Sequence, residues 1–192
     1  RGTRAIMLDK FRQPDKLLAA MERLVPIAIE MGVRTAAANN SPVVFIPLHK
    51  GADGFLSVPD FAKFYWPTLK ATIVGLIQEG LMPYVFVEGS YNQRLQYLAD
   101  PEIARGRVLW AFDQTDMREA KRILGDHSCI AGNVPVSLLK TAKPEAVTSY
   151  VRDLIEVMGH DGGFILSNGA VLDDAEPENL HAFLDAGKEF GA

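Results

Sequence analysis

The chain has 192 residues, of which 48% are hydrophobic and 23% charged, a composition that predicts a single globular domain with a substantial core. It contains no apolar run of about 18 residues, the length of a membrane span, and no secretory signal, so we expect a cytoplasmic protein without a membrane partner. The net charge of −4 without a basic face argues against nucleic acid, and the lone Cys129 excludes an internal disulfide and any zinc site that needs two cysteines.

Apolar residues at helical spacing alternate along the chain with short β-branched and aromatic runs. The predicted helices are residues 4–12, 14–31, 57–80, 92–99, 115–124, 144–158 and 178–190. The predicted strands that lie between them are residues 43–48, 84–87, 107–112, 128–131 and 163–166.

Single residues set the predicted limits of these elements. Pro26 is expected to kink the second helix, because proline removes a backbone donor. Ser57 begins the third helix, with Asp60 three residues on as the second half of a weak capping box. Pro83 is expected to end that helix, and Thr115 is expected to cap the helix that follows the third strand.

Strand and helix alternate about five times with short connections. This alternation predicts parallel βα units with right-handed crossovers, which let a sheet roll into a barrel. Five units are too few to close eight strands, so we predict an α/β fold in which residues 1–192 form one domain: the C-terminal portion of a TIM-type (β/α)8 barrel, without its N-terminal part. Expressed alone, such an open sheet leaves two edges and an apolar face uncovered, and we expect it to be poorly soluble or oligomeric.

Residues 81–92 (LMPYVFVEGSYN) organise the predicted site. Glu88 and Gly89 stand where the second strand ends, and a carboxylate at the end of a buried strand is unfavourable unless it is solvated or paired. In parallel α/β folds, ligands bind at the edge formed by the carboxyl ends of the strands. That edge, here called the rim, is predicted to carry five polar residues: His49, Glu88, Asp113, Asn133 and Asn168.

Each rim residue has a functional and a structural interpretation. His49 is either a metal ligand or general acid–base group, or a solvated loop histidine. Glu88 is either a metal ligand or a base, or a carboxylate that caps the next helix, where the helix dipole favours it. Asp113 is either similar in role to Glu88 or a helix-start residue. Asn133 and Asn168, each beside a glycine, are typical of tight turns with positive φ.

Three long stretches resemble the uroporphyrinogen decarboxylase superfamily, which also contains zinc-dependent methyltransferases that act on corrinoid proteins. They are residues 56–89 (LSVPDFAKFYWPTLKATIVGLIQEGLMPYVFVEG), 123–155 (ILGDHSCIAGNVPVSLLKTAKPEAVTSYVRDLI) and 162–191 (GGFILSNGAVLDDAEPENLHAFLDAGKEFG). The resemblance begins near Asp9, covers nearly the whole chain after it, and corresponds to the C-terminal half to two-thirds of a family member. It implies a TIM-type barrel and an enzyme, either methyltransferase-like or a carboxy-lyase.

Two sets of site residues that the resemblance implies are altered in this chain. The corrinoid methyltransferases place a His-x-Cys motif at the second strand end and a cysteine further on, and the matching positions here are Phe86, Glu88 and Ala170. The decarboxylases carry a histidine in a C-terminal Gly-His-Gly motif, and the matching residues 167–170 read SNGA. His49, by contrast, falls where many decarboxylases have a histidine after the same strand.

The resemblance leaves three functions open. The first is a methyltransferase-like enzyme that takes its methyl group from a small-molecule donor, a corrinoid on a partner protein or another methyl carrier. The second is the uroporphyrinogen decarboxylase of porphyrin (heme) biosynthesis, whose substrate is an acidic tetrapyrrole. The third is a module that binds a tetrapyrrole or a corrinoid protein without catalysis.

The resemblance also implies roles for the rim residues. Zinc or another divalent metal would be held by His49 and Glu88, with Asp113 as a third ligand. The same three residues are the expected catalytic groups. The residues expected to bind substrate are Gly89, Asn133 and Asn168.

Overall fold

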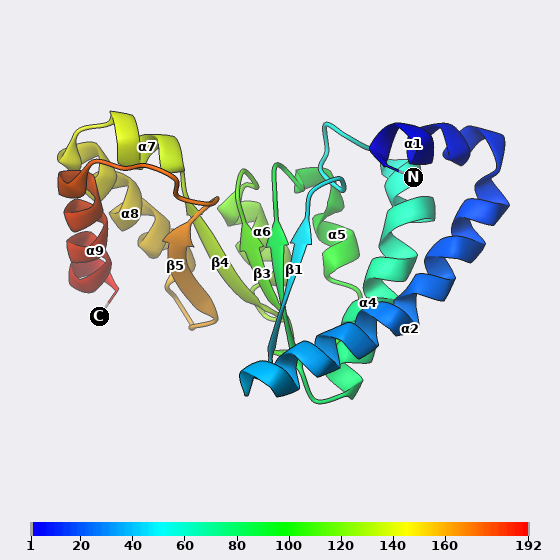
Figure 1. Cartoon of the computed structure of the whole chain (residues 1–192). Coiled ribbons are helices and arrows are strands. Elements are labelled where there is room, and N and C mark those ends of the chain that lie inside the picture. The colour runs from blue at the N-terminus through cyan, green and yellow to red at the C-terminus, as the bar shows by residue number, and fades with distance from the viewer. Residues whose placement is uncertain (1, 192) are drawn as a thin grey trace.

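A computed structural model describes residues 2–191 as a curved sheet of five parallel strands with helices against its convex face (Figure 1). The strands are β1 (Val43–Leu48), β2 (Met82–Val87), β3 (Leu109–Phe112), β4 (Cys129–Val134) and β5 (Phe164–Asn168). The helices are α1 (Thr3–Arg12), α2 (Pro14–Asn39), α3 (Val58–Asp60), α4 (Trp66–Gln78), α5 (Leu95–Leu98), α6 (Met117–Leu124), α7 (Val136–Thr141), α8 (Pro144–Met158) and α9 (Pro177–Phe190). Two short turns lead into α4 and α5: the π-helical η1 (Phe61–Tyr65) and the 3₁₀-helical η2 (Asn92–Arg94).

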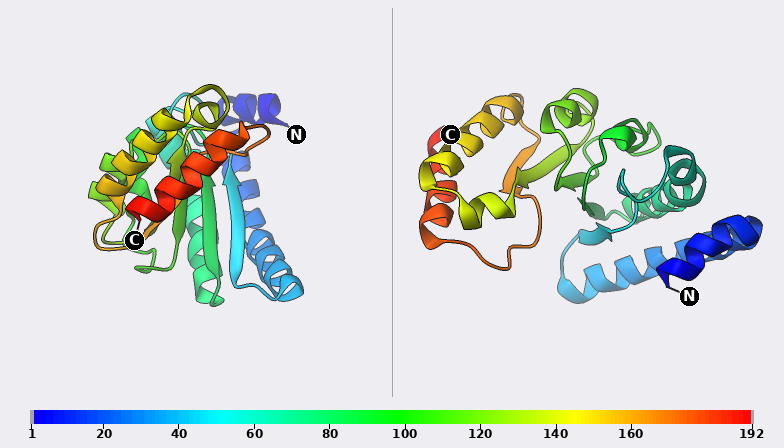
Figure 2. Two further views of the ribbon diagram at one scale, coloured as in Figure 1. Left: turned by 90° about the vertical axis from the view of Figure 1, so that its left-hand side faces the viewer. Right: turned by 90° about the horizontal axis from the view of Figure 1, so that it is seen from above.

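The strands pair in chain order, β1-β2-β3-β4-β5, and every pair is parallel. Seen from above, they follow an arc with the helices outside it (Figure 2). Parallel neighbours require a crossover between consecutive strands, so this order confirms the predicted α/β fold of about five βα units. Within residues 2–191, no helix combines the length and the hydropathy that a membrane crossing requires.

Side chains of the strands alternate between the two faces of the sheet. Val85, Trp110 and Ile130 lie opposite one another in neighbouring strands and are almost wholly buried on the side that the helices cover. The alternate positions face the concave side, where Phe45 and Ile165 remain exposed. The core therefore lies between sheet and helices, while the concave face leads up to the rim.

Two predicted element limits are wrong for local reasons. Pro83 does not end a helix: the chain leaves α4 through Gly80, whose φ of 81° lies in the left-handed region that glycine adopts, and Pro83 lies inside β2. Thr115 does not cap α6. The cap is Asp116, whose carboxylate accepts two backbone N–H groups of the first turn.

Other elements are longer than predicted. The helix α2 continues past Met31 to Asn39 through an alanine-rich segment, which has high helix propensity but no apolar periodicity. The strands β4 and β5 extend to Val134 and Asn168, so Asn133 lies within a strand rather than after one. The short helix α7 had no counterpart in the prediction.

The salt bridge between Lys10 and Asp60 joins α1 to α3, at 2.5 Å from Nζ to Oδ2. Hydrogen bonds from Lys10 and then from Ser57 lower the pKa of Asp60 below its ordinary 3.8. Because the folded-state pKa is depressed, this contribution to stability is present above about pH 4 and is lost as the pH falls through the folded-state value. We expect Asp60→Asn to cost up to about 1 kcal/mol at neutral pH and progressively less below about pH 4, as measured by urea unfolding. A cost independent of pH would contradict this.

Candidate active site at the carboxyl ends of the strands

The sheet register brings the predicted rim residues to one edge. Leu48 and Phe112 both lie opposite Val87, so His49, Glu88 and Asp113 follow at the same level of three adjacent strands. Asn133 and Asn168 lie in the last two residues of β4 and β5. The prediction that these five residues share the rim is confirmed.

His49 and Glu88 are in direct contact. Nδ1 of the imidazole meets Oε2 of the carboxylate, and the two side chains are 58% and 47% exposed. When a carboxylate accepts from Nδ1–H, it fixes the tautomer and leaves the lone pair on Nε2. The carboxylate of Glu88 is thus paired with His49 and does not cap the next helix. The pair is an imidazole held by a carboxylate with its second nitrogen available for proton transfer.

Asp113 lies beside this pair but is turned toward the backbone of the neighbouring loop. Its Oδ2 accepts a hydrogen bond from the N–H of Gly89 at 3.0 Å, and its own N–H donates to the carbonyl of Val87 at 3.3 Å. Gly89 has a φ of 79°, a conformation that favours glycine. Asp113 thus fixes the turn that directly follows Glu88.

The two asparagines use their amides within the fold. Asn133 is buried, and its Nδ2 donates to the carbonyls of Asp113 at 3.1 Å and Thr115 at 2.9 Å, while Tyr150 donates to its Oδ1 at 3.3 Å. Asn168 donates to the carbonyl of Ala170 at 2.5 Å. Neither asparagine has a positive φ, so the predicted tight-turn conformation is wrong for both.

Replacing Asn133 by aspartate is expected to destabilise the fold by about 1–3 kcal/mol, because a buried carboxylate would face two carbonyl oxygens in place of a donor. Equilibrium urea unfolding measures this change. The exposed Gln96 on α5 offers a matched control: Gln96→Glu makes the same change of amide to carboxylate and should cost less than about 0.5 kcal/mol. Equal losses in the two variants would show that the amide of Asn133 is not needed.

A polar cleft of about 710 Å³ opens next to the rim, between the β3–α6 loop and helices α7 and α8. It shares Asp113 and Asn133 with the rim, and its other polar side chains include Asp116, Arg118 and Tyr150. Sequence reasoning missed these residues. Tyr150 belongs to the helical repeat of core-facing residues on α8. This repeat does not reveal that its hydroxyl reaches Asn133 at the end of β4.

Two tyrosines lie beneath the loop that carries His49. Burial raises the pKa of Tyr91 strongly, and the neighbouring Tyr65 raises it further; burial also raises the pKa of Tyr65. A Cβ added to Gly51 would come within 2.2 Å of the Tyr91 hydroxyl oxygen and 2.8 Å of a Tyr65 ring carbon. Both phenols therefore stay protonated at neutral pH, and both pack closely against the loop that carries His49.

The rim offers two neighbouring donors for a metal ion, the imidazole of His49 and the carboxylate of Glu88. Asp113, the predicted third ligand, is engaged with the N–H of Gly89. Across the described part of the chain, no group of three His, Cys, Asp or Glu side chains is placed to hold a metal ion. Catalytic zinc sites have three protein ligands, so these residues do not fit zinc on their own and are better suited to moving a proton.

Comparisons with known proteins agree with this architecture. The profile of the family described as Uroporphyrinogen decarboxylase (URO-D) matches residues 1–190. The chain is 26% identical over 187 residues to uroporphyrinogen decarboxylase of Pseudoalteromonas translucida, which covers 95% of this chain and 51% of that protein. It is 31% identical over 117 residues to the one of Methylococcus capsulatus, covering 60% of this chain and 32% of that protein.

A methyltransferase from Methanosarcina mazei has the same fold. It superposes with a TM-score of 0.80 at 17% sequence identity, over 98% of this chain and 54% of that one. Some curated relatives align with nearly all of this chain, and the chain spans about half of the length of those relatives. Such coverage, with five parallel βα units, is consistent with part of a TIM-type barrel. Since the family profile matches nearly every residue, the chain belongs to the uroporphyrinogen decarboxylase (URO-D) family.

Proposed function

We propose that the chain contributes the acid–base part of the active site of a methyltransferase-like enzyme that acts with a corrinoid or another methyl carrier. The observation that supports this is the contact of His49 with Glu88 on an open rim, at the ends of two adjacent strands. Such a pair accepts a proton from a substrate and stabilises the resulting imidazolium. Methyl transfer to a thiol requires such a proton acceptor, because the thiolate and not the thiol is the nucleophile.

In the proposed step, Nε2 of His49 accepts the proton of the acceptor thiol while Glu88 stabilises the imidazolium through Nδ1–H. The carrier supplies an electrophilic methyl group. The thiolate forms the new carbon–sulfur bond, and the electron pair of the broken bond stays on the carrier. His49 then releases its proton to solvent, which reaches it because the side chain is more than half exposed.

Uroporphyrinogen decarboxylase activity is the second candidate, and the names of the curated relatives favour it. An acidic tetrapyrrole calls for cationic side chains at its site. Near this rim, Arg94 is wholly buried in an ion pair with Asp53. The exposed cations Lys50 and Arg118 lie among the carboxylates of Glu88, Asp113 and Asp116. The described residues of the rim and its cleft thus carry no excess of positive charge for an acidic tetrapyrrole, which favours the first candidate.

The two activities are separated by offering both substrates to the full-length polypeptide. A methylated corrinoid with a small thiol tests methyl transfer, followed by visible absorbance of the corrinoid and by the mass of the thioether. Uroporphyrinogen tests decarboxylation, followed by release of CO2. We expect the thioether to form. Release of CO2 without thioether would replace this proposal by the decarboxylase, and corrinoid binding without either product would indicate a binding module.

A further inference from the structure

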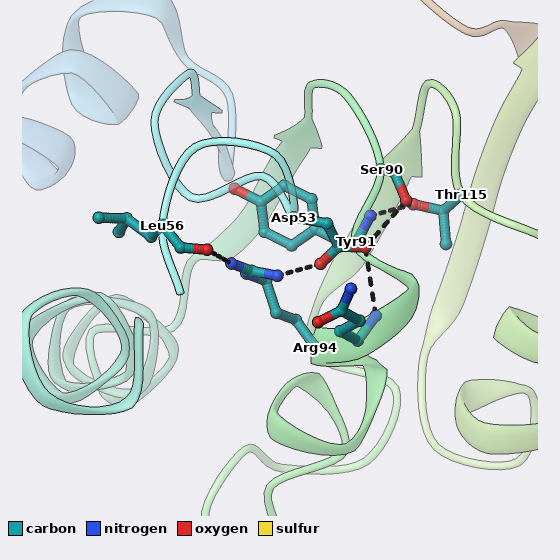
Figure 3. A network of polar contacts seen from close by, with 7 residues as sticks. Asp53, Leu56, Ser90, Tyr91, Arg94 and Thr115 are labelled. Carbon is teal, nitrogen blue, oxygen red and sulfur yellow. Dashed lines mark hydrogen bonds and ion pairs between the residues drawn. The ribbon is translucent and has the colours of Figure 1, made fainter. Parts of the chain in front are cut away.

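The loops that carry His49 and Glu88 are joined by a buried polar network around Asp53 and Arg94 (Figure 3). Asp53 lies four residues after His49 in the β1–α3 loop, and Arg94 lies in η2, six residues after Glu88. The acid–base mechanism proposed above uses neither of them.

Asp53 ties its loop to the segment after β2 through both carboxylate oxygens. Oδ1 accepts from Nη1 of Arg94, and Oδ2 accepts from the hydroxyl of Ser90 at 2.9 Å and from the N–H of Gln93 at 3.2 Å. The backbone adds a further link, since the N–H of Asp53 donates to the carbonyl of Ser90 at 2.8 Å. One carboxylate thus holds three groups of the loop that follows Glu88.

Arg94 completes the connection from below. Its side chain is 0% exposed, Nη2 donates to the carbonyl of Leu56 at 2.5 Å, and the guanidinium lies over the rings of Phe61 at 5.0 Å and Tyr91 at 5.9 Å. A buried guanidinium that is both ion-paired and stacked has one geometry, because it is planar and its donors are fixed. Figure 3 shows it between the carbonyl of Leu56 and the carboxylate of Asp53.

The same segment is fastened to the next loop of the rim. The N–H of Tyr91 donates to the hydroxyl of Thr115 at 3.0 Å, and Oδ1 of Asn92 accepts from the N–H of Asp116 at 2.8 Å. The loops after β1, β2 and β3 therefore form one connected layer beneath the rim, with Asp53 and Arg94 at its buried centre.

We infer that Asp53 and Arg94 are positioning residues that hold His49 against Glu88, an inference that rests on the acid–base role proposed above. His49 and Glu88 are about half exposed, and among residues 2–191 neither side chain makes another hydrogen bond or ion pair that would fix it. An exposed pair by itself contributes little energy and loses side-chain entropy on forming. Its geometry is therefore set by the two loops, and these loops are set by the buried ion pair.

The test reads the tautomer of the His49 ring in the full-length polypeptide labelled with ¹⁵N-histidine. Long-range ¹H–¹⁵N spectra distinguish protonation at Nδ1 from protonation at Nε2, and His49→Gln identifies the signal. We expect the Nδ1–H form to dominate in the parent, because Glu88 accepts from it. Asp53→Asn should shift the ring toward the Nε2–H form that free histidine prefers and lower kcat by about 10- to 100-fold, with a smaller change in KM.

A matched control separates positioning from stability. Asp100 pairs with Lys70 at 3.1 Å in the connection between α5 and β3 and is 17% exposed, close to the 12% of Asp53. Asp100→Asn should lower stability to a similar extent but leave the His49 ring and kcat unchanged. A tautomer shift of equal size in Asp100→Asn would overturn the inference, since it would then reflect general loosening.

A milder variant keeps the test decisive if Asp53→Asn does not fold. Ser90→Ala removes one hydrogen bond to Asp53 and leaves both buried charges paired, and it should produce a smaller shift in the same direction. An unchanged tautomer of the His49 ring in folded Asp53→Asn overturns the inference that Asp53 and Arg94 position His49. If Asp53→Asn does not fold, an unchanged tautomer in Ser90→Ala overturns it. If the parent protein has no methyl-transfer activity, the tautomer of His49 still tests whether Asp53 and Arg94 position it. Failure of the proposed function is thereby distinguished from failure of this inference.

Discussion

Replacing Glu88 by glutamine is expected to lower turnover by about 10²–10⁴-fold while costing less than about 1 kcal/mol of folding free energy. The turnover falls because the neutral amide neither stabilises the imidazolium of His49 nor fixes its tautomer as a carboxylate does. The stability changes little because both side chains are about half exposed and the contact is solvated. Steady-state kinetics and urea unfolding of the full-length polypeptide measure the two quantities.

Glu102 provides the matched control for this change. It is an exposed glutamate that pairs with Lys70 at 2.6 Å, in the connection before β3 and away from the rim. Glu102→Gln removes the same kind of surface contact and should leave turnover unaltered. Turnover of Glu88→Gln equal to that of the Glu102→Gln control would assign Glu88 a merely solvated role, and the functional interpretation would then rest on His49 alone.

Replacing Phe61 by alanine is expected to remove about 3–5 kcal/mol of stability, which is a large share of the total for a domain. Phe61 is 0% exposed, and its ring meets those of Tyr97 at 5.4 Å and Tyr91 at 6.2 Å. It also forms the surface against which the guanidinium of Arg94 lies. Alanine would leave a cavity beneath a buried charge, so the loss exceeds the transfer free energy of the ring alone.

The exposed Phe11 provides a matched control for the effect of burial at Phe61. Phe11→Ala makes the same chemical change on α1, at a side chain that is 77% exposed, and should cost less than about 0.5 kcal/mol. Phe61→Leu should fall between the two, since it keeps most of the buried volume. Equilibrium urea unfolding compares the midpoints of the three variants, provided that the dependence of the free energy on urea concentration (the m-value) is the same in all of them. Similar midpoints for Phe61→Ala and Phe11→Ala would show that this aromatic cluster does not support the fold.

The order and direction of the strands could be read from the sequence because each depends on strong local patterns. Apolar runs such as residues 43–48, separated by helical periodicity, leave few topologies other than parallel βα units. The limits of elements were less accessible, since they depend on contacts across the chain. Thr115 has the sequence pattern of a helix cap, yet its hydroxyl is used by Tyr91, and Asp116 takes the capping position.

The candidate site was predicted in position but only partly in chemistry. Because parallel strands end at one edge, a polar residue after each strand was enough to place His49, Glu88 and Asp113 together. Sequence cannot say which of these groups touch, and the structure pairs His49 with Glu88 while Asp113 binds a backbone amide. Arg94 was missed altogether, because nothing in its local pattern distinguishes a buried arginine from a solvated one.

The simple strand order also bears on how the chain folds as it is synthesised. Within residues 2–191, each strand pairs only with strands that are its immediate neighbours in the chain, so β2 can dock on β1 before β3 has left the ribosome. Closing each such loop involves only the helical crossover between two consecutive strands, which keeps the entropic cost of every step moderate. Growth by addition to one advancing edge also brings Arg94 to Asp53 as soon as the second unit docks. The paired loops after β1 and β2 can therefore be in place while the rest of the sheet is still emerging.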